Sequence, residues 1–147
     1  VVALNVLEHI ERDQEALCHL HRIIRPGGVA HIEVPANPEL YGIYDEYLMH
    51  HRRYALPEIL SKAKSAGFEI LRVTHLGFSI YPAFWAVKKW NLRYLLKSEE
   101  QKRNIVAKQI RQTKNSLLMK SLIELEMKLG KYVNFPWGIR CVLKCRK

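Results

Sequence analysis

The chain has 147 residues, 48% of them apolar, which is enough for a domain with a hydrophobic core and excludes a disordered chain. The formal net charge is +10, but residues 1–87 carry a net −2 and residues 88–147 a net +12. A half this basic is attracted to phosphate on anionic lipid, on nucleic acid or on the rest of its own protein, and the alternative is a solvated helical face. The sequence has no apolar run of about 18 residues, so no membrane-spanning helix is expected.

The first 35 residues predict a strand, a helix and a second strand. Residues 1–7 form a short apolar run, typical of a strand buried on both faces of a parallel sheet. Asp13 is a candidate N-cap, and apolar residues follow at helical spacing until Pro26-Gly27-Gly28 ends the helix. Residues 29–34 then form the next strand, which predicts a right-handed βαβ unit.

A segment without clear periodicity follows, at residues 36–54. We expect it to be a long loop, of the kind that often covers a binding site. Pro57 suits the first turn of a helix that Gly67 stops, and residues 68–75 alternate as another strand.

From residue 78 onward the pattern changes to aromatic and basic helices. Aromatic residues mixed with lysines occupy residues 78–97, and Ser98 with Gln101 resembles a capping box for a long helical stretch. Residues 138–147 predict a final strand, because apolar and basic residues alternate there.

The three cysteines, Cys18, Cys141 and Cys145, do not form a disulfide framework. The last two are four residues apart, on one face of the final strand, and have no histidine near them in the sequence. Because this is weak evidence for zinc, we predict reduced thiols and no metal site.

The residues at the joints of these elements resemble the second half of a class I S-adenosylmethionine (SAM)-dependent methyltransferase, over about residues 1–76. The resemblance rests on the order and spacing of Asn5-Val6-Leu7-Glu8-His9-Ile10, Leu20-His21-Arg22-Ile23-Ile24-Arg25-Pro26-Gly27-Gly28, Val34-Pro35-Ala36, Asp45, His51-Arg52-Arg53-Tyr54 and Ala66-Gly67-Phe68. In that family the sheet has seven strands, the last antiparallel to the others. The resemblance therefore implies an α/β fold with strands four to seven of a Rossmann-like sheet and a helical insertion before the last strand.

This resemblance also implies a division of the chain into three parts. Residues 1–77 would form the C-terminal half of the methyltransferase core, residues 78–137 an aromatic and basic helical cap, and residues 138–147 the final strand. The Gly-rich turn and the acidic residue that hold SAM in the family have no counterpart in this sequence. We therefore expect a fragment that binds SAM weakly or not at all by itself and is inactive without the other half.

The end of the first strand is the predicted centre of the site. Ligands of open α/β sheets bind beyond the carboxyl ends of the strands, which places Asn5 to His9 in the crevice. The resemblance implies that Asn5, Val6 and Leu7 contact SAM. His9 is the candidate catalytic base or acceptor contact, because imidazole exchanges protons near neutral pH. The alternative is a histidine that packs at a helix start and bonds the backbone, and Glu8 is likewise either catalytic or a solvated or capping acid.

The segment from Asn37 to Tyr54 is predicted to cover the acceptor side of the site. Arg52 or Arg53 can hold a carboxylate or phosphate through two hydrogen bonds. In the alternative, one of these arginines pairs with Asp45 or Glu46 and locks the loop. The predicted acceptor contacts are Asp45, His51, Arg52, Arg53 and Tyr54.

These features predict a cytoplasmic or membrane-associated enzyme that transfers a methyl group from SAM to a small-molecule or lipid-like acceptor. Aromatic and basic residues between positions 78 and 97 suit the headgroup region of an anionic membrane, or else pack as a cap on the sheet. A second hypothesis is a non-catalytic basic module that docks on anionic membrane or a partner protein, and a third is a subunit that completes another methyltransferase. Nucleic acid is the weaker partner, because no zinc-finger spacing or RNA-binding motif is present.

Overall fold

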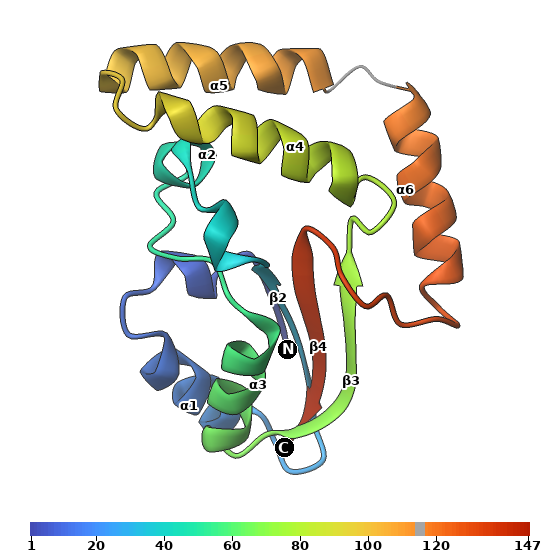
Figure 1. The fold of residues 1–147 in the computed structure, drawn as a ribbon. Helices are drawn as coiled ribbons and strands as arrows, with labels where there is room; N and C mark the ends of the chain where they lie inside the picture. Colours follow the sequence, from blue (N-terminus) through green and yellow to red (C-terminus); the bar gives the residue numbers. More distant parts are fainter. Residues whose placement is uncertain (114–116) are drawn as a thin grey trace.

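The computed structural model describes residues 1–113 and 117–147, with side chains described outside residues 109–119. Within this part, four strands form one mixed sheet that helices cover on one face and at one end (Figure 1). The strands are β1 (Val2–Leu4), β2 (Val29–Pro35), β3 (Glu69–Leu76) and β4 (Arg140–Arg146). Their spatial order is β1-β2-β4-β3, in which β1 and β2 are parallel and β4 is antiparallel to both of its neighbours.

Two helices from the first half of the chain cover one face of the sheet. They are α1 (Asp13–Ile23) and α3 (Leu56–Ser65). Gly27 lies in the turn between α1 and β2 and has a φ of 74°, a left-handed conformation that glycine adopts without strain. The core between these helices and the sheet includes Leu17, Ile32, Ile59 and Leu143, all fully buried. The order strand, helix, strand and the helix that begins beside Pro57 are as the sequence predicts. The first strand is shorter than the predicted residues 1–7 and is not buried on both faces, because it lies at an edge of the sheet within the described part of the chain.

The segment predicted as a long loop contains two short helices. They are the 3-10 helix η2 (Pro38–Leu40) and α2 (Ile43–Tyr47). A third short helix, η1 (Leu7–His9), follows β1. The Asp45 carboxylate accepts a hydrogen bond from the Gly42 N–H at 3.0 Å, so α2 is stabilised by a carboxylate inside its own first turn. The prediction that Asp13 is an N-cap is wrong. Asp13 is the first residue of α1, and its side chain points into the protein.

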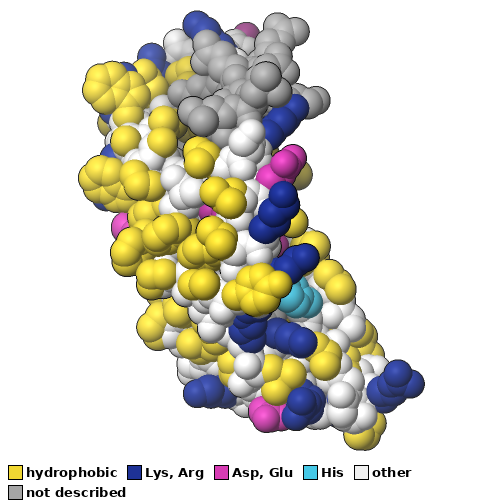
Figure 2. All heavy atoms as spheres, turned by 90° about the vertical axis from the view of Figure 1, so that its right-hand side faces the viewer, with side chains coloured by type: hydrophobic (Ala, Val, Ile, Leu, Met, Phe, Trp, Pro, Cys, Tyr) yellow, Lys and Arg dark blue, Asp and Glu magenta, His cyan; other side chains and the backbone are white. Residues whose placement is uncertain are grey.

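The remaining helices lie between β3 and β4 in the sequence. They are α4 (Tyr81–Asn91), η3 (Leu92–Tyr94), α5 (Glu99–Thr113) and α6 (Leu117–Leu129). Helices α4 and α5 run across one end of the sheet, and α6 lies beside β3 (Figure 1). On the side that carries α6, hydrophobic side chains gather with lysines and arginines among them (Figure 2). Among the described residues, no helix combines the length and apolar character needed to cross a bilayer.

A buried carboxylate fastens α6 to the turn between β3 and α4. Glu126 accepts hydrogen bonds from the backbone N–H groups of Gly77, Phe78 and Ser79 at 2.6, 3.0 and 2.9 Å, and from the Ser79 hydroxyl at 2.7 Å. Burial raises the pKa of Glu126, but these hydrogen bonds outweigh that effect and hold its pKa below the ordinary value. The turn and the helix are therefore joined by one ionised side chain.

The outer edge of β1 is apolar and exposed. Val2 and Leu4 are 67% and 49% exposed, and β1 has only β2 as a strand neighbour among the described residues. Edge strands of soluble proteins are usually short, charged or covered. An uncovered apolar edge of this kind is suited to pairing with another strand.

Candidate functional site

The chain turns sharply at the carboxyl end of β1. Asn5 adopts a left-handed conformation with a φ of 53°, which asparagine tolerates better than most residues. Its N–H donates to the Glu33 carbonyl of β2 at 3.0 Å, so the turn stays attached to the sheet. The next residues form η1 and present Glu8 and His9 beyond the end of the strand.

The segment from Asp45 to Tyr54 returns to this same end of the sheet. The His51 N–H donates to the Glu8 carbonyl at 2.8 Å. The Tyr54 hydroxyl donates to the Asp13 carboxylate at 2.9 Å, and its oxygen lies 3.1 Å from the Leu7 carbonyl. His9 Nδ1 lies 3.3 Å from the Met49 carbonyl. Two segments about 40 residues apart in the sequence therefore meet beyond β1, which is the arrangement that a site in this crevice requires.

Three of these residues bring metal-binding or proton-transferring groups together. One ligand atom each of Glu8, His9 and His50 lie within 4.8 Å of one another. His50 Nε2 is 4.0 Å from Glu8 Oε1, and the two imidazole rings meet edge to face at 4.7 Å. Glu8 is fully buried, and neither carboxylate oxygen has a hydrogen-bond partner within the described part of the chain. Burial accordingly raises the pKa of Glu8.

A buried ionic network lies directly behind this group. The Asp45 carboxylate accepts hydrogen bonds from Arg53 Nε at 2.8 Å and from Lys88 Nζ at 2.6 Å, and His50 Nδ1 lies 3.2 Å away. Burial raises the pKa of Asp45, but Arg53 and Lys88 together hold it below the ordinary value. Burial and the nearby Arg53 charge lower the pKa of Lys88 to about 8, against the attraction of Asp45. At neutral pH Asp45 and Lys88 are both charged, because the carboxylate contacts Lys88 and Arg53 directly.

The predicted acceptor contacts separate into buried and accessible residues. Asp45, Arg53 and Tyr54 are buried, and they hold the segment in place through the contacts given above. His51 is exposed, and Arg52 is partly exposed while its guanidinium donates to the Glu11 carbonyl at 2.8 Å. The alternative in which one arginine pairs with Asp45 and locks the loop therefore describes Arg53. Acceptor contact by any of the five remains a prediction.

Asn5, Val6 and Leu7 differ in what they can offer to a cofactor. Val6 is exposed and Asn5 is half-buried, whereas Leu7 packs in the hydrophobic core. An apolar side chain beside an amide at the carboxyl end of a strand fits one wall of a nucleoside site. Val6 and Asn5 therefore fit one side of a SAM site, and Leu7 packs in the core beneath them.

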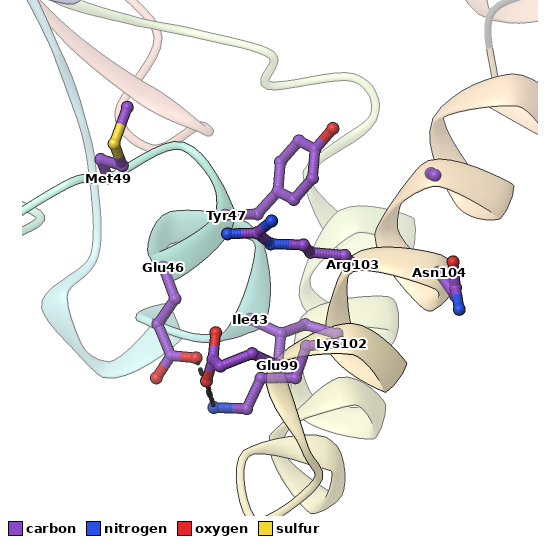
Figure 3. Close-up of a pocket in the computed structure, with 9 residues that line it drawn as sticks. Ile43, Glu46, Tyr47, Met49, Glu99, Lys102, Arg103 and Asn104 are labelled. Carbon is purple, nitrogen blue, oxygen red and sulfur yellow. Dashed lines mark hydrogen bonds and ion pairs between the residues drawn. The ribbon is translucent and has the colours of Figure 1, made fainter.

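A pocket opens beside the site, between α2 and α5 (Figure 3). Lys102 of α5 crosses it to Glu46 of α2 at 2.8 Å and also pairs with Glu99 at 3.0 Å. Arg103 extends along the pocket toward Tyr47 in Figure 3. The pocket is lined by Ile43, Glu46, Tyr47, Met49, Glu99, Lys102, Arg103, Asn104 and Ala107. Met49 belongs both to this lining and, through its carbonyl, to the His9 contact, so the pocket borders the crevice.

Sequence reasoning missed several residues of this region. Lys88 and Lys102 come from the helical insertion, and nothing local in the sequence connects them with Asp45 or Glu46. His50 is one of the polar residues of the predicted loop but is not among the predicted acceptor contacts, although the His50-His51 pair favours both histidines equally.

This sheet order and the crevice beyond β1 define a Rossmann-like fold of the kind found in SAM-dependent methyltransferases, and the predicted fold class is confirmed. The chain resembles a SAM-dependent methyltransferase from Archaeoglobus fulgidus (TM-score 0.50, 14% identity), of which it covers 58% while 100% of this chain is matched. It also resembles a proposed sarcosine dimethylglycine methyltransferase from Galdieria sulphuraria (TM-score 0.52, 16% identity; 99% of this chain and 51% of that one). A third match is the cyclopropane synthase MmaA2 from Mycobacterium tuberculosis (TM-score 0.50, 16% identity; 99% and 54%).

The chain thus spans about half the length of these structures. No family model matches the sequence, and no curated protein matches it either. At 14–16% identity the likeness establishes the fold, and a shared fold does not by itself establish a shared reaction.

Proposed function

We propose that the chain is the acceptor-side half of a SAM-dependent methyltransferase that acts on a small-molecule or lipid-like acceptor. The observation that carries this proposal is the meeting of Asn5–His9 with Asp45–Tyr54 beyond the carboxyl end of β1. The exposed apolar edge of β1 supports it, because a further strand placed there would extend the sheet and complete the other wall of the crevice.

SAM supplies the methyl group as a sulfonium, and the protein aligns the acceptor with that group and excludes water. In this chain Val6 and Asn5 form one wall for the cofactor. The pocket between α2 and α5 receives the acceptor. Arg103 is the cation available there for an anionic group, because Lys102 is already paired with Glu46 and Glu99. If the acceptor is a hydroxyl or an acid, His9 is placed to take its proton, because its ring is exposed at the mouth of the crevice.

We expect SAM to bind only when the chain is assembled with the half that supplies the first three strands. Titration calorimetry with SAM or S-adenosylhomocysteine on the assembled protein measures this directly. In that protein, Val6→Asp is expected to weaken cofactor affinity at least about tenfold, because it places a carboxylate against the uncharged nucleoside part of the cofactor. The matched control is Ile23→Ala, which alters an exposed apolar residue at the far end of α1. An assembled protein that binds neither compound would contradict the proposal.

A second candidate function is docking on anionic membrane, and the exposed face of α4 favours it. Trp85 and Trp90 are 45% and 60% exposed, and Leu96 after η3 is fully exposed. Basic groups lie against these aromatic rings: the Arg93 guanidinium is 3.3 Å from the centre of the Trp90 ring, and Lys89 Nζ is 6.0 Å from that of Trp85. Interleaved aromatic and basic side chains of this kind suit the headgroup region of a bilayer.

We expect the chain to sediment with vesicles that contain phosphatidylserine and to be released by salt, because basic residues provide much of the attraction. Trp85→Ala combined with Trp90→Ala is expected to weaken this binding several-fold, whereas Ile23→Ala leaves it unchanged. Equal binding to phosphatidylcholine vesicles, or no effect of the double substitution, would count against this second function.

A further inference from the structure

We propose that Glu8, His9 and His50 bind one divalent transition-metal ion of the zinc type at the carboxyl end of β1. The group supplies one carboxylate and two imidazoles, a donor set that suits zinc, cobalt, manganese or iron(II). The ligand atoms lie within 4.8 Å of one another and come from two segments that the backbone holds together.

The buried carboxylate is the first argument for a cation. Glu8 is fully buried, and both of its oxygens are without hydrogen-bond partners among the residues that the structure describes. A buried ionised carboxylate is strongly unfavourable unless a cation or several donors satisfy it. Arg53 and Lys88 are the basic groups of the adjacent network, and both are directed at Asp45. Arg140 also acts on Glu8, but its guanidinium pairs directly with Glu33. A metal ion would place a positive charge in direct contact with the Glu8 carboxylate.

The two histidines are oriented as metal ligands. His50 Nδ1 lies 3.2 Å from the Asp45 carboxylate, and His9 Nδ1 lies 3.3 Å from the Met49 carbonyl. An acceptor at Nδ1 favours the tautomer that carries its proton there and leaves Nε2 with a free lone pair. Metal-binding histidines usually show this pattern, in which the outer nitrogen donates to a carboxylate or carbonyl while the other binds the ion.

The spacing needs only a small adjustment on binding. Two atoms that bind the same tetrahedral zinc ion, each about 2.1 Å from it, lie roughly 3.4 Å apart. Atoms spread over 4.8 Å therefore have to close by at most about 1.4 Å, which rotation of the exposed His9 ring can supply. Three protein ligands leave a coordination position free for water or an oxygen of another molecule. Metal binding does not depend on the proposed methyl transfer. An ion on His9 Nε2 occupies the lone pair that would otherwise accept a proton, so His9 acts either as a metal ligand or as the base and not as both at once.

The test is titration of the chain, stripped with a chelator, with Zn²⁺ by calorimetry and with Co²⁺ by visible absorption. We expect one ion per chain and cobalt bands that report nitrogen and oxygen ligands. Glu8→Gln keeps the shape of the side chain but removes its charge, and it is expected to weaken binding at least about 100-fold. His50→Ala should abolish the cobalt spectrum.

The matched control is Cys18→Ser combined with His19→Ala, which removes two exposed neighbouring ligands on α1 that also attract zinc. This control should bind as the original chain does. Thermal melts in chelator show that each variant is folded, and added Zn²⁺ should raise the melting temperature of the original chain but not that of Glu8→Gln. Absence of stoichiometric binding, or unchanged affinity in Glu8→Gln, overturns the proposal. Because SAM is absent from these measurements, the metal site and the methyltransferase proposal fail independently.

Discussion

Replacing Asp45 with alanine is expected to lower the free energy of unfolding of the chain by about 3–5 kcal/mol. The carboxylate contacts Arg53 Nε at 2.8 Å and Lys88 Nζ at 2.6 Å, and all three side chains are buried. Its removal leaves two positive charges in the interior without a partner. Such a loss exceeds what is usual for a single substitution, because it is a charge imbalance rather than a missing contact.

Urea unfolding followed by circular dichroism measures this effect, with Glu46→Ala as the control. Glu46 pairs with Lys102 and is more exposed than Asp45, so its loss should cost less than about 1 kcal/mol. The folded-state pKa of Asp45 lies below its unfolded value, so the stabilisation is present above the unfolded pKa and is lost as the pH falls through the folded pKa. The acid limb of the stability curve should therefore flatten in Asp45→Ala. Equal losses in the two variants would contradict the network as described.

Replacing Glu126 with glutamine is expected to lower the free energy of unfolding by about 2–3 kcal/mol. The carboxylate accepts four hydrogen bonds, three of them from backbone N–H groups. The amide has a single oxygen and no charge, and its NH₂ group faces donors instead of acceptors. The variant should therefore loosen both the β3–α4 turn and the attachment of α6.

The control for this substitution is Glu124→Gln, which alters an exposed residue of the same helix and should stay within about 0.5 kcal/mol of the original chain. The folded pKa of Glu126 is lowered, so its contribution is present above the unfolded pKa and disappears at acid pH. The two stability curves should accordingly converge there. A constant difference at all pH values would mean that shape, and not ionisation, sets the effect.

In the first half of the fold, local patterns predict the βαβ unit and the helix at Pro57, but they do not predict the short helices η1, η2 and α2. The apolar run at 1–7, the stop at Pro26-Gly27-Gly28 and the Pro57 start each depend on neighbouring residues only. The position of β4 between β2 and β3 is a long-range pairing that no local pattern contains. It was expected only because the joints resemble a known family.

The site was predicted in outline but not in its connections. The crevice location of Asn5–His9 follows from parallel-sheet geometry. The partners of Asp45 do not follow, because Lys88 is 43 residues away on a helix whose aromatic composition pointed to surface contacts. The proposed metal site has no local signal either. Glu8 and His50 are far apart in the sequence, and the His51–Glu8 backbone hydrogen bond brings them together.

The segment from Asp45 to Tyr54 contains two sets of residues with different roles. Asp45, Arg53 and Tyr54 anchor it from the interior, while Tyr47, Leu48, Met49 and His51 face outward. Exchanges among the outward residues leave the anchors untouched. A laboratory search for new preferences at the proposed acceptor side can therefore randomise positions 47, 48 and 51 with little loss of folded protein, because other residues of the segment anchor it. Position 49 is more restricted, because Met49 has a left-handed φ of 58° that β-branched residues do not tolerate.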